Sequence, residues 1–80
     1  MREQIRSYIV ENFLFGDDSG LDDSVSFLES GMIDSTGILE VISFLEENFP
    51  IKVKDDELIP ENLDSIQNLV GYLGRKMATA

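Results

Sequence analysis

An apolar stripe with helical spacing at residues 38–49 constrains the fold more than any other feature of the sequence. Its members recur every three or four positions, as they do on one face of an α-helix: Ile38, Val41, Ile42, Leu45 and Phe49. Two further stripes of this kind lie at residues 5–13 and 66–77, and the stretches between them have no clear period. Helices that each bury one face must pack against one another, so we expect an all-α fold.

The three stripes predict helices over about residues 3–14, 35–49 and 64–77, with Asp64 as the N-cap of the last one. A short helical turn is expected at residues 55–58, ended by Pro60. The fold expected is a small four-helix bundle, with three main helices, one short helix and a long first loop. Residues 1–80 are expected to form a single domain, near the lower size limit for folding without a metal or disulfide.

The first loop begins with the stretch FGDDSGLDDS, whose glycines and aspartates favour irregular structure. Leu21 is expected to anchor this loop to the core. Five later apolar residues are expected to lie beneath the helices: Val25, Phe27, Leu28, Met32 and Ile33. The aspartates lack the alternation of oxygen ligands that a calcium loop needs, so no metal site is predicted.

Two residue types that carry much enzyme chemistry are missing from the chain. Without cysteine there is no thiolate nucleophile, and without histidine there is no side chain that ordinarily titrates near neutral pH. We therefore expect no catalysis by the protein itself. The apolar runs are far shorter than the ~20 residues of a membrane-spanning helix. Residues 1–13 are too charged for a secretory signal, which favours the cytoplasm.

The negative charge is concentrated in one block. Residues 11–49 hold ten acidic residues and no basic one, and the formal net charge of the whole chain is −10. A surface of this sign repels nucleic acid and anionic lipid and attracts basic proteins. Binding to nucleic acid and insertion into a membrane are therefore not expected.

The segment GMIDSTG, residues 31–37, places Ser35 where the second main helix begins. A serine there can cap the helix through its hydroxyl. The same helix end can also stabilise a phosphate on that hydroxyl, because free amides and the helix dipole favour an anion. Asp34 can help to hold a divalent cation during phosphate transfer, or it can act as a second cap.

The segment from Ser26 to Leu73 resembles the acyl carrier proteins and the stand-alone aminoacyl and peptidyl carriers. The matching features are Asp34-Ser35, Glu40, the Leu-Glu-Glu at residues 45–47, Phe49 and the closing NLDSIQNLVGYL. The resemblance implies that Ser35 carries 4′-phosphopantetheine through a phosphodiester, with Asp34, Thr36 and Gly37 around the attachment point. It implies a monomer that carries acyl or aminoacyl thioesters in fatty-acid-like or specialised pathways.

The resemblance also implies the partners: a phosphopantetheinyl transferase, a loading ligase and downstream synthases or transferases. Partner enzymes of such carriers present basic groups to the second main helix. The residues expected to contact them are Glu40, Ser43, Phe44, Glu46 and Glu47. Fatty-acid carriers usually have leucine and then aspartate after the serine, where this chain has Thr36 and Gly37.

Gly37 is expected on the exposed face beside Ser35, where it leaves room for the arm or a partner. On that interpretation, Gly37→Ala raises the melting temperature slightly and slows modification. Two alternatives to a carrier remain open from the residues alone. One is an acidic protein-interaction module without a prosthetic group, and the other is a calcium-responsive domain built on residues 17–23.

Overall fold

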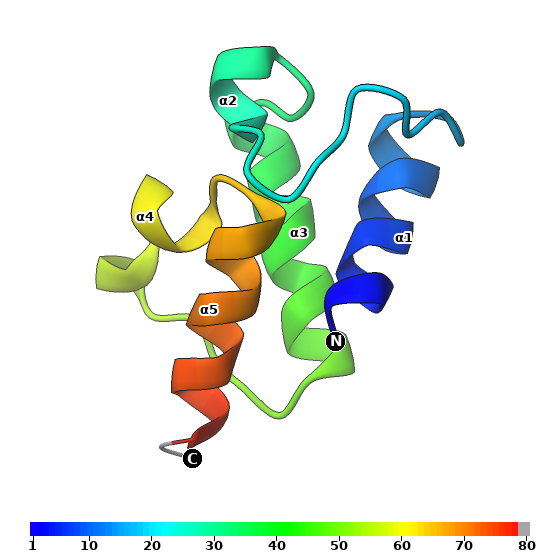
Figure 1. The fold of residues 1–80 in the computed structure, drawn as a ribbon. Helices are drawn as coiled ribbons and strands as arrows, with labels where there is room; N and C mark the ends of the chain where they lie inside the picture. Colours follow the sequence, from blue (N-terminus) through cyan, green and yellow to red (C-terminus); the bar gives the residue numbers. More distant parts are fainter. Residues whose placement is uncertain (79–80) are drawn as a thin grey trace.

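The computed structural model describes residues 1–78 and contains no β-strand within them. Three main helices dominate it, α1 (Arg2–Phe13), α3 (Ser35–Asn48) and α5 (Ile66–Ala78) (Figure 1). The all-α fold with three main helices is thus confirmed. The short elements are more numerous than periodicity predicted: α2 (Phe27–Ser30), the 3₁₀ turn η1 (Asp55–Glu57) and α4 (Pro60–Leu63).

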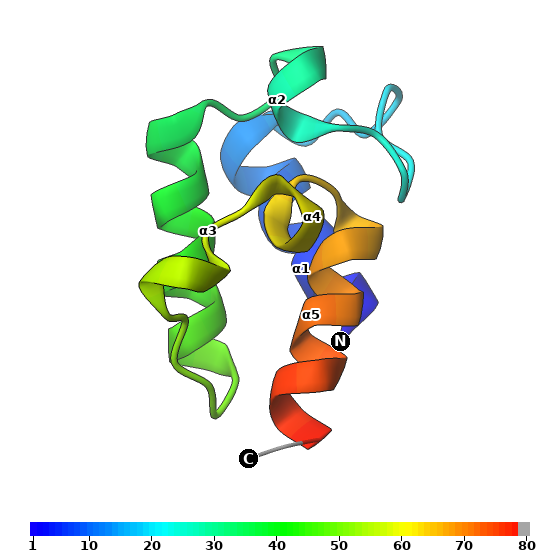
Figure 2. The same ribbon diagram turned by 90° about the vertical axis from the view of Figure 1, so that its left-hand side faces the viewer.

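Helix α1 runs in the opposite direction to α3 and α5, and all three surround one core (Figures 1 and 2). The buried apolar residues are Ile5, Ile9, Leu21, Phe27, Ile33, Val41, Leu45, Ile51, Leu63, Ile66, Leu69, Tyr72 and Leu73. The predicted burial of Leu21, Phe27 and Ile33 is confirmed, and Val25 and Met32 are partly buried. The burial predicted for Leu28 is wrong, because that residue is 43% exposed.

The buried face of α3 agrees with the predicted one at Val41 and Leu45, but it also includes Gly37, which was expected on the exposed face. Gly37, Val41 and Leu45, spaced four residues apart, are buried, while Ile38 and Ile42 are only partly buried. Hydropathy missed Gly37 because a glycine contributes nothing to an apolar stripe. Ile38, Ile42 and Phe49 pack against the edge of the core, while Leu39 is exposed.

Two end signals also operate differently from the prediction. Pro60 does not end a helix but begins α4, where its missing N–H costs nothing. At the start of α5 the hydroxyl of Ser65, rather than Asp64, accepts a hydrogen bond from the amide of Asn68 at 3.0 Å. The Asp64 carboxylate instead accepts hydrogen bonds from the Ser26 hydroxyl and from the amide of Leu28 at 3.0 Å, which joins α2 to the α4–α5 junction.

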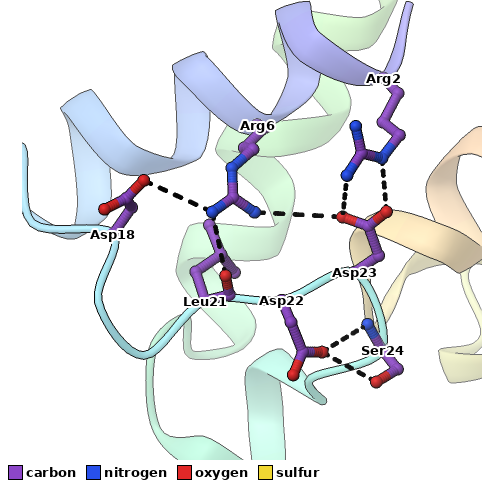
Figure 3. Close-up of polar contacts among 7 residues, drawn as sticks. All are labelled: Arg2, Arg6, Asp18, Leu21, Asp22, Asp23 and Ser24. Atoms are coloured by element: carbon purple, nitrogen blue, oxygen red, sulfur yellow. Dashed lines mark hydrogen bonds and ion pairs between the residues drawn. The ribbon is translucent and has the colours of Figure 1, made fainter.

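Two arginines of α1 fasten the long first loop to the helix (Figure 3). Arg2 forms an ion pair with Asp23, in which the Nη2–Oδ1 distance is 3.0 Å. Arg6 donates to the backbone oxygen of Leu21 at 3.0 Å and lies 3.5 Å from Asp18. Part of the acidic block is therefore neutralised within the fold.

Glu57 joins the segment after α3 to the last helix. One of its carboxylate oxygens accepts hydrogen bonds from the Lys54 amide at 2.9 Å, the Tyr72 hydroxyl at 3.0 Å and the Lys76 ammonium at 3.0 Å. These donors, led by the Lys54 amide, lower the pKa of Glu57 from 4.5 to about 2. Burial and the nearby carboxylate raise the pKa of Tyr72 to about 12.

We expect Glu57→Gln to lower the melting temperature at pH 7. We also expect the melting temperature of this variant to fall less steeply than that of wild type when the pH is lowered. A carboxyl group whose pKa is depressed by folding stabilises above its unfolded pKa of 4.5. That stability is lost as the pH falls towards the folded pKa of about 2. The difference in melting temperature between wild type and Glu57→Gln should therefore shrink as the pH falls from 4.5 towards about 2. Glu61→Gln, at an exposed position on α4, is the control, and a Glu57→Gln curve parallel to wild type would contradict the assignment.

Candidate functional site

The first turn of α3 places Asp34 and Ser35 in different roles. Asp34 is the N-cap, and its Oδ1 accepts a hydrogen bond from the Gly37 amide at 2.8 Å. Ser35 is the first helical residue and is exposed. The interpretation of Ser35 as the cap is therefore wrong, because the neighbouring carboxylate occupies that role.

The Ser35 hydroxyl makes no hydrogen bond to any of residues 1–78, and neither do the backbone amides of Ser35 and Thr36. Both residues are exposed. Free amides at the start of a 14-residue helix present a partial positive charge to an anion. The position therefore fits a phosphodiester on Ser35, since the hydroxyl is accessible and the helix end favours the phosphate.

An apolar groove of about 270 Å³ opens beside Ser35. Its lining comes from α2, α3 and the η1–α4 segment: Leu28, Ser35, Ile38, Leu39, Ile42, Leu58, Ile59, Pro60, Leu63 and Asp64. Leu39 is 58% exposed in this groove, and Leu28, Leu58 and Ile59 of its lining are exposed as well. Sequence reasoning missed the groove, although the four apolar residues between Ile38 and Ile42 made this part of the helix more apolar than core packing needs.

Gly37 is buried, which corrects the expectation that it lies on the exposed face. A β-carbon at this position would lie 2.6 Å from Cγ2 of Ile33 and 3.0 Å from Cε1 of Phe13. Both distances are shorter than carbon atoms tolerate without a shift. The glycine therefore allows the end of α1 and the segment before α3 to pack closely on the first turn of α3.

The residues predicted to contact partners divide into two groups. Glu40, Ser43 and Glu47 are exposed, and neither carboxylate has a basic partner within residues 1–78. Glu46 is partly buried and accepts a hydrogen bond from the Val53 amide at 2.9 Å. Its carboxylate therefore also holds the segment that follows α3.

Phe44 is only partly exposed, because its ring stacks on that of Tyr8 with centroids 4.0 Å apart. The Tyr8 hydroxyl donates to the backbone oxygen of Glu40 at 3.2 Å. Burial raises the pKa of Tyr8, and the carboxylates of Glu40 and Glu47 raise it further. The acidic face of α3 thus adjoins α1 at the stacked pair of Tyr8 and Phe44.

No group of three or more potential metal ligands is assembled anywhere in residues 1–78. The loop aspartates instead make local contacts. Asp22 accepts hydrogen bonds from the amide and hydroxyl of Ser24, which lower the pKa of Asp22, and Asp17 accepts one from the Ser19 amide at 3.0 Å. The arrangement gives no support to a calcium-responsive loop.

The fold is a small bundle of three main helices, with a free serine hydroxyl at the start of one and an apolar groove beside it. This arrangement is the one expected of a small helical carrier domain. The model of the family described as "Phosphopantetheine attachment site" matches residues 3–73. The chain belongs to this family. It is a carrier with covalently attached 4′-phosphopantetheine, and it is acted on by other enzymes rather than catalysing a reaction itself.

Named relatives agree with this assignment. The chain is 26% identical over 78 residues to the "Probable acyl carrier protein PigG" of a Serratia species, covering 98% of this chain and 90% of the relative. It is 34% identical over 73 residues to an acyl carrier protein of Akkermansia muciniphila, covering 91% and 88%. These relatives place the chain among the acyl carrier proteins.

A solved structure titled "Crystal structure of FAD-dependent dehydrogenase" contains a chain of the same fold. The TM-score is 0.76 at 22% sequence identity, and the match covers 86% of this chain and 97% of the other. At that identity the likeness concerns the fold alone. Within residues 1–78, no helix combines the length and the apolar character needed to cross a bilayer.

Proposed function

We propose that Ser35 is the attachment point of the phosphopantetheine arm. The observation that carries this proposal is the exposed Ser35 hydroxyl, which is free of protein hydrogen bonds at the start of α3. Asp34 supports it by holding the first turn through the Gly37 amide, and Thr36 by leaving its own amide free for the phosphate. Residues 1–80 act as one carrier domain in this proposal.

The cargo proposed is an acyl or aminoacyl group, held as a thioester on the thiol that the arm supplies. The groove beside Ser35 offers an apolar surface for the carbon chain of the cargo, and Ile38, Leu39 and Ile42 line its α3 wall. The Thr36-Gly37 pair departs from the leucine and aspartate usual in fatty-acid carriers. We therefore favour a dedicated carrier of a specialised pathway in the cytoplasm, served by its own loading ligase and downstream enzymes.

The test is intact mass spectrometry of the protein after incubation with a phosphopantetheinyl transferase and coenzyme A. We expect one increment of about 340 Da, the size of the phosphopantetheine group. Incubation of that product with a loading ligase, ATP and candidate acids should add the acid as a thioester that hydroxylamine removes. A wild-type protein that gains no mass with several transferases would refute the proposal.

Glu40 and Glu47 are proposed to attract basic groups of the partner enzymes. Replacing both with lysine should slow modification of Ser35 and weaken its salt dependence, since close approach then lacks electrostatic steering. Folding should change little, because exposed charges contribute only ~0–1 kcal/mol each. The measurement is the rate of mass gain at several salt concentrations.

The matched control reverses Asp55 and Asp56, two exposed carboxylates of η1, and changes the net charge equally. Equal slowing in both double variants would mean that total charge, not the α3 face, sets the rate. An unchanged rate in Glu40→Lys/Glu47→Lys would remove this face from partner recognition.

A further inference from the structure

Phe15 combines two unfavourable features directly after α1. Its side chain is 95% exposed, more than any other large apolar residue among residues 1–78. Its φ angle is 54°, and no other non-glycine residue in the described part of the chain has a positive φ. A bulky side chain in the left-handed region is strained. An aromatic ring that stays exposed to water also forgoes the free energy that burial would give.

The position is one that helices usually give to glycine, the residue after the C-cap Leu14. A glycine stands one place later, at Gly16, so the turn holds an aromatic residue where a smaller one would be less strained. Two backbone hydrogen bonds close this turn. The Gly16 amide donates to the Val10 oxygen at 3.0 Å, and the Asp17 amide donates to the Leu14 oxygen at 3.0 Å. The backbone therefore holds the Phe15 ring outward.

Phe15 lies at the same end of the molecule as Ser35. The ring of Phe13, two residues earlier, is next to Gly37 in the first turn of α3. The last turn of α1 and the first turn of α3 accordingly adjoin, at the end of the molecule that also carries α2 (Figure 1). A protein that approaches Ser35 from this end therefore comes close to the turn that carries Phe15.

We propose that Phe15 is a docking anchor for the transferase that modifies Ser35, and this inference rests on the proposed function. In that reaction the Ser35 oxygen bonds to the phosphorus nearer the pantetheine and the P–O–P bond of coenzyme A breaks. Adenosine 3′,5′-bisphosphate leaves, and the serine proton passes to a base of the transferase. The transferase must therefore bring its active centre to the protein surface, whereas enzymes that act on the thiol meet the far end of the arm.

The chemistry of the docking surface follows from its neighbours. The Asp17 carboxylate, exposed two residues after Phe15, is held by the Ser19 amide, and Asp18 follows it. The partner surface that fits is an apolar pocket for one aromatic ring with basic groups at its rim. Exposed aromatic side chains of this kind often contribute a large share of the affinity of an interface.

The test compares the apo protein with Phe15→Asn, Phe15→Gly and Phe15→Tyr as substrates of the transferase from the same organism. Asparagine and glycine tolerate the left-handed region, so both variants should match or exceed the wild-type melting temperature. Both should lose about tenfold in kcat/KM for mass gain, mainly through KM, since an anchor affects binding. Phe15→Tyr keeps the ring and should stay near wild type.

The outcomes separate this inference from the proposed function. If wild type is modified and Phe15→Asn is modified at the same kcat/KM, the anchor is refuted while the carrier function stands. If wild type gains no mass, both fail. Light scattering tests whether a second copy of the chain binds the ring instead. If wild type is a dimer, Phe15→Asn is a monomer and modification is unchanged, the ring serves self-association and the proposal is overturned.

Discussion

Ser35→Ala should abolish the mass increment of about 340 Da that wild type gains with transferase and coenzyme A. The expected effect is complete, because the phosphodiester needs a hydroxyl and alanine has none. The fold should be unaffected. The Ser35 hydroxyl makes no hydrogen bond to residues 1–78, and alanine is favourable in a first helical turn. A melting curve that matches wild type would show that only the chemistry was removed.

Two other serines provide matched controls. Ser43 is exposed on the same helix, and Ser30 lies in α2 near the groove. Neither stands at the start of a main helix beside a capping aspartate, so Ser43→Ala and Ser30→Ala should gain the full increment. Modification that persists in Ser35→Ala, or that disappears in one of the controls, would move the attachment point to another serine.

Gly37→Ala should destabilise the protein, against the usual gain when glycine is replaced within a helix. The new methyl group would lie 2.6 Å from Cγ2 of the buried Ile33 and 3.0 Å from the Phe13 ring. Overpacking of this kind typically costs about 1–3 kcal/mol, whereas helix propensity returns at most about 1 kcal/mol. A net loss of about 1 kcal/mol lowers the melting temperature of a domain of this size by roughly 4–8 °C.

Gly74→Ala is the matched control for this prediction. Gly74 also lies within a helix, but a β-carbon there meets no heavy atom within 4 Å. That variant should gain up to about 1 kcal/mol from helix propensity. Chemical denaturation of the two variants and wild type measures both effects. A stabilised Gly37→Ala would mean that Ile33 and Phe13 relax easily, and the role of the glycine in packing would be refuted.

Gly37 also shows why part of the site was not predictable from the sequence. The three main helices could be predicted because side chains such as Val41, Leu45 and Leu69 repeat with helical spacing. A buried glycine adds nothing to that pattern, so the place of Gly37 in the core was not predicted. The cap was ambiguous for a related reason, since Asp34 and Ser35 are both good N-caps and only the backbone distinguishes them.

The groove depends on tertiary contacts that no local pattern reveals. Opposite the wall from α3, the groove is lined by Leu28 of α2 and by residues Leu58 to Leu63, some thirty positions away in the sequence. The Asp64 carboxylate joins these segments by reaching to Ser26 and Leu28, whereas local rules placed Asp64 as a cap. Four-residue helices also have too little period to be recognised.

The same Asp64 contact has a consequence for the dynamics of the groove. Helices α2 and α4 are too short to persist alone, so their hold on each other depends largely on the Asp64 hydrogen bonds and on Phe27 and Leu63, which are buried in the core. Helices α2 and α4 therefore form a small cooperative unit of the groove that can open while α1, α3 and α5 stay folded. In hydrogen exchange, the amides of Leu28 and Glu29 should be exchanged well before those of Val41 and Leu45. On this basis we expect the width of the groove to vary more than the packing of the three main helices.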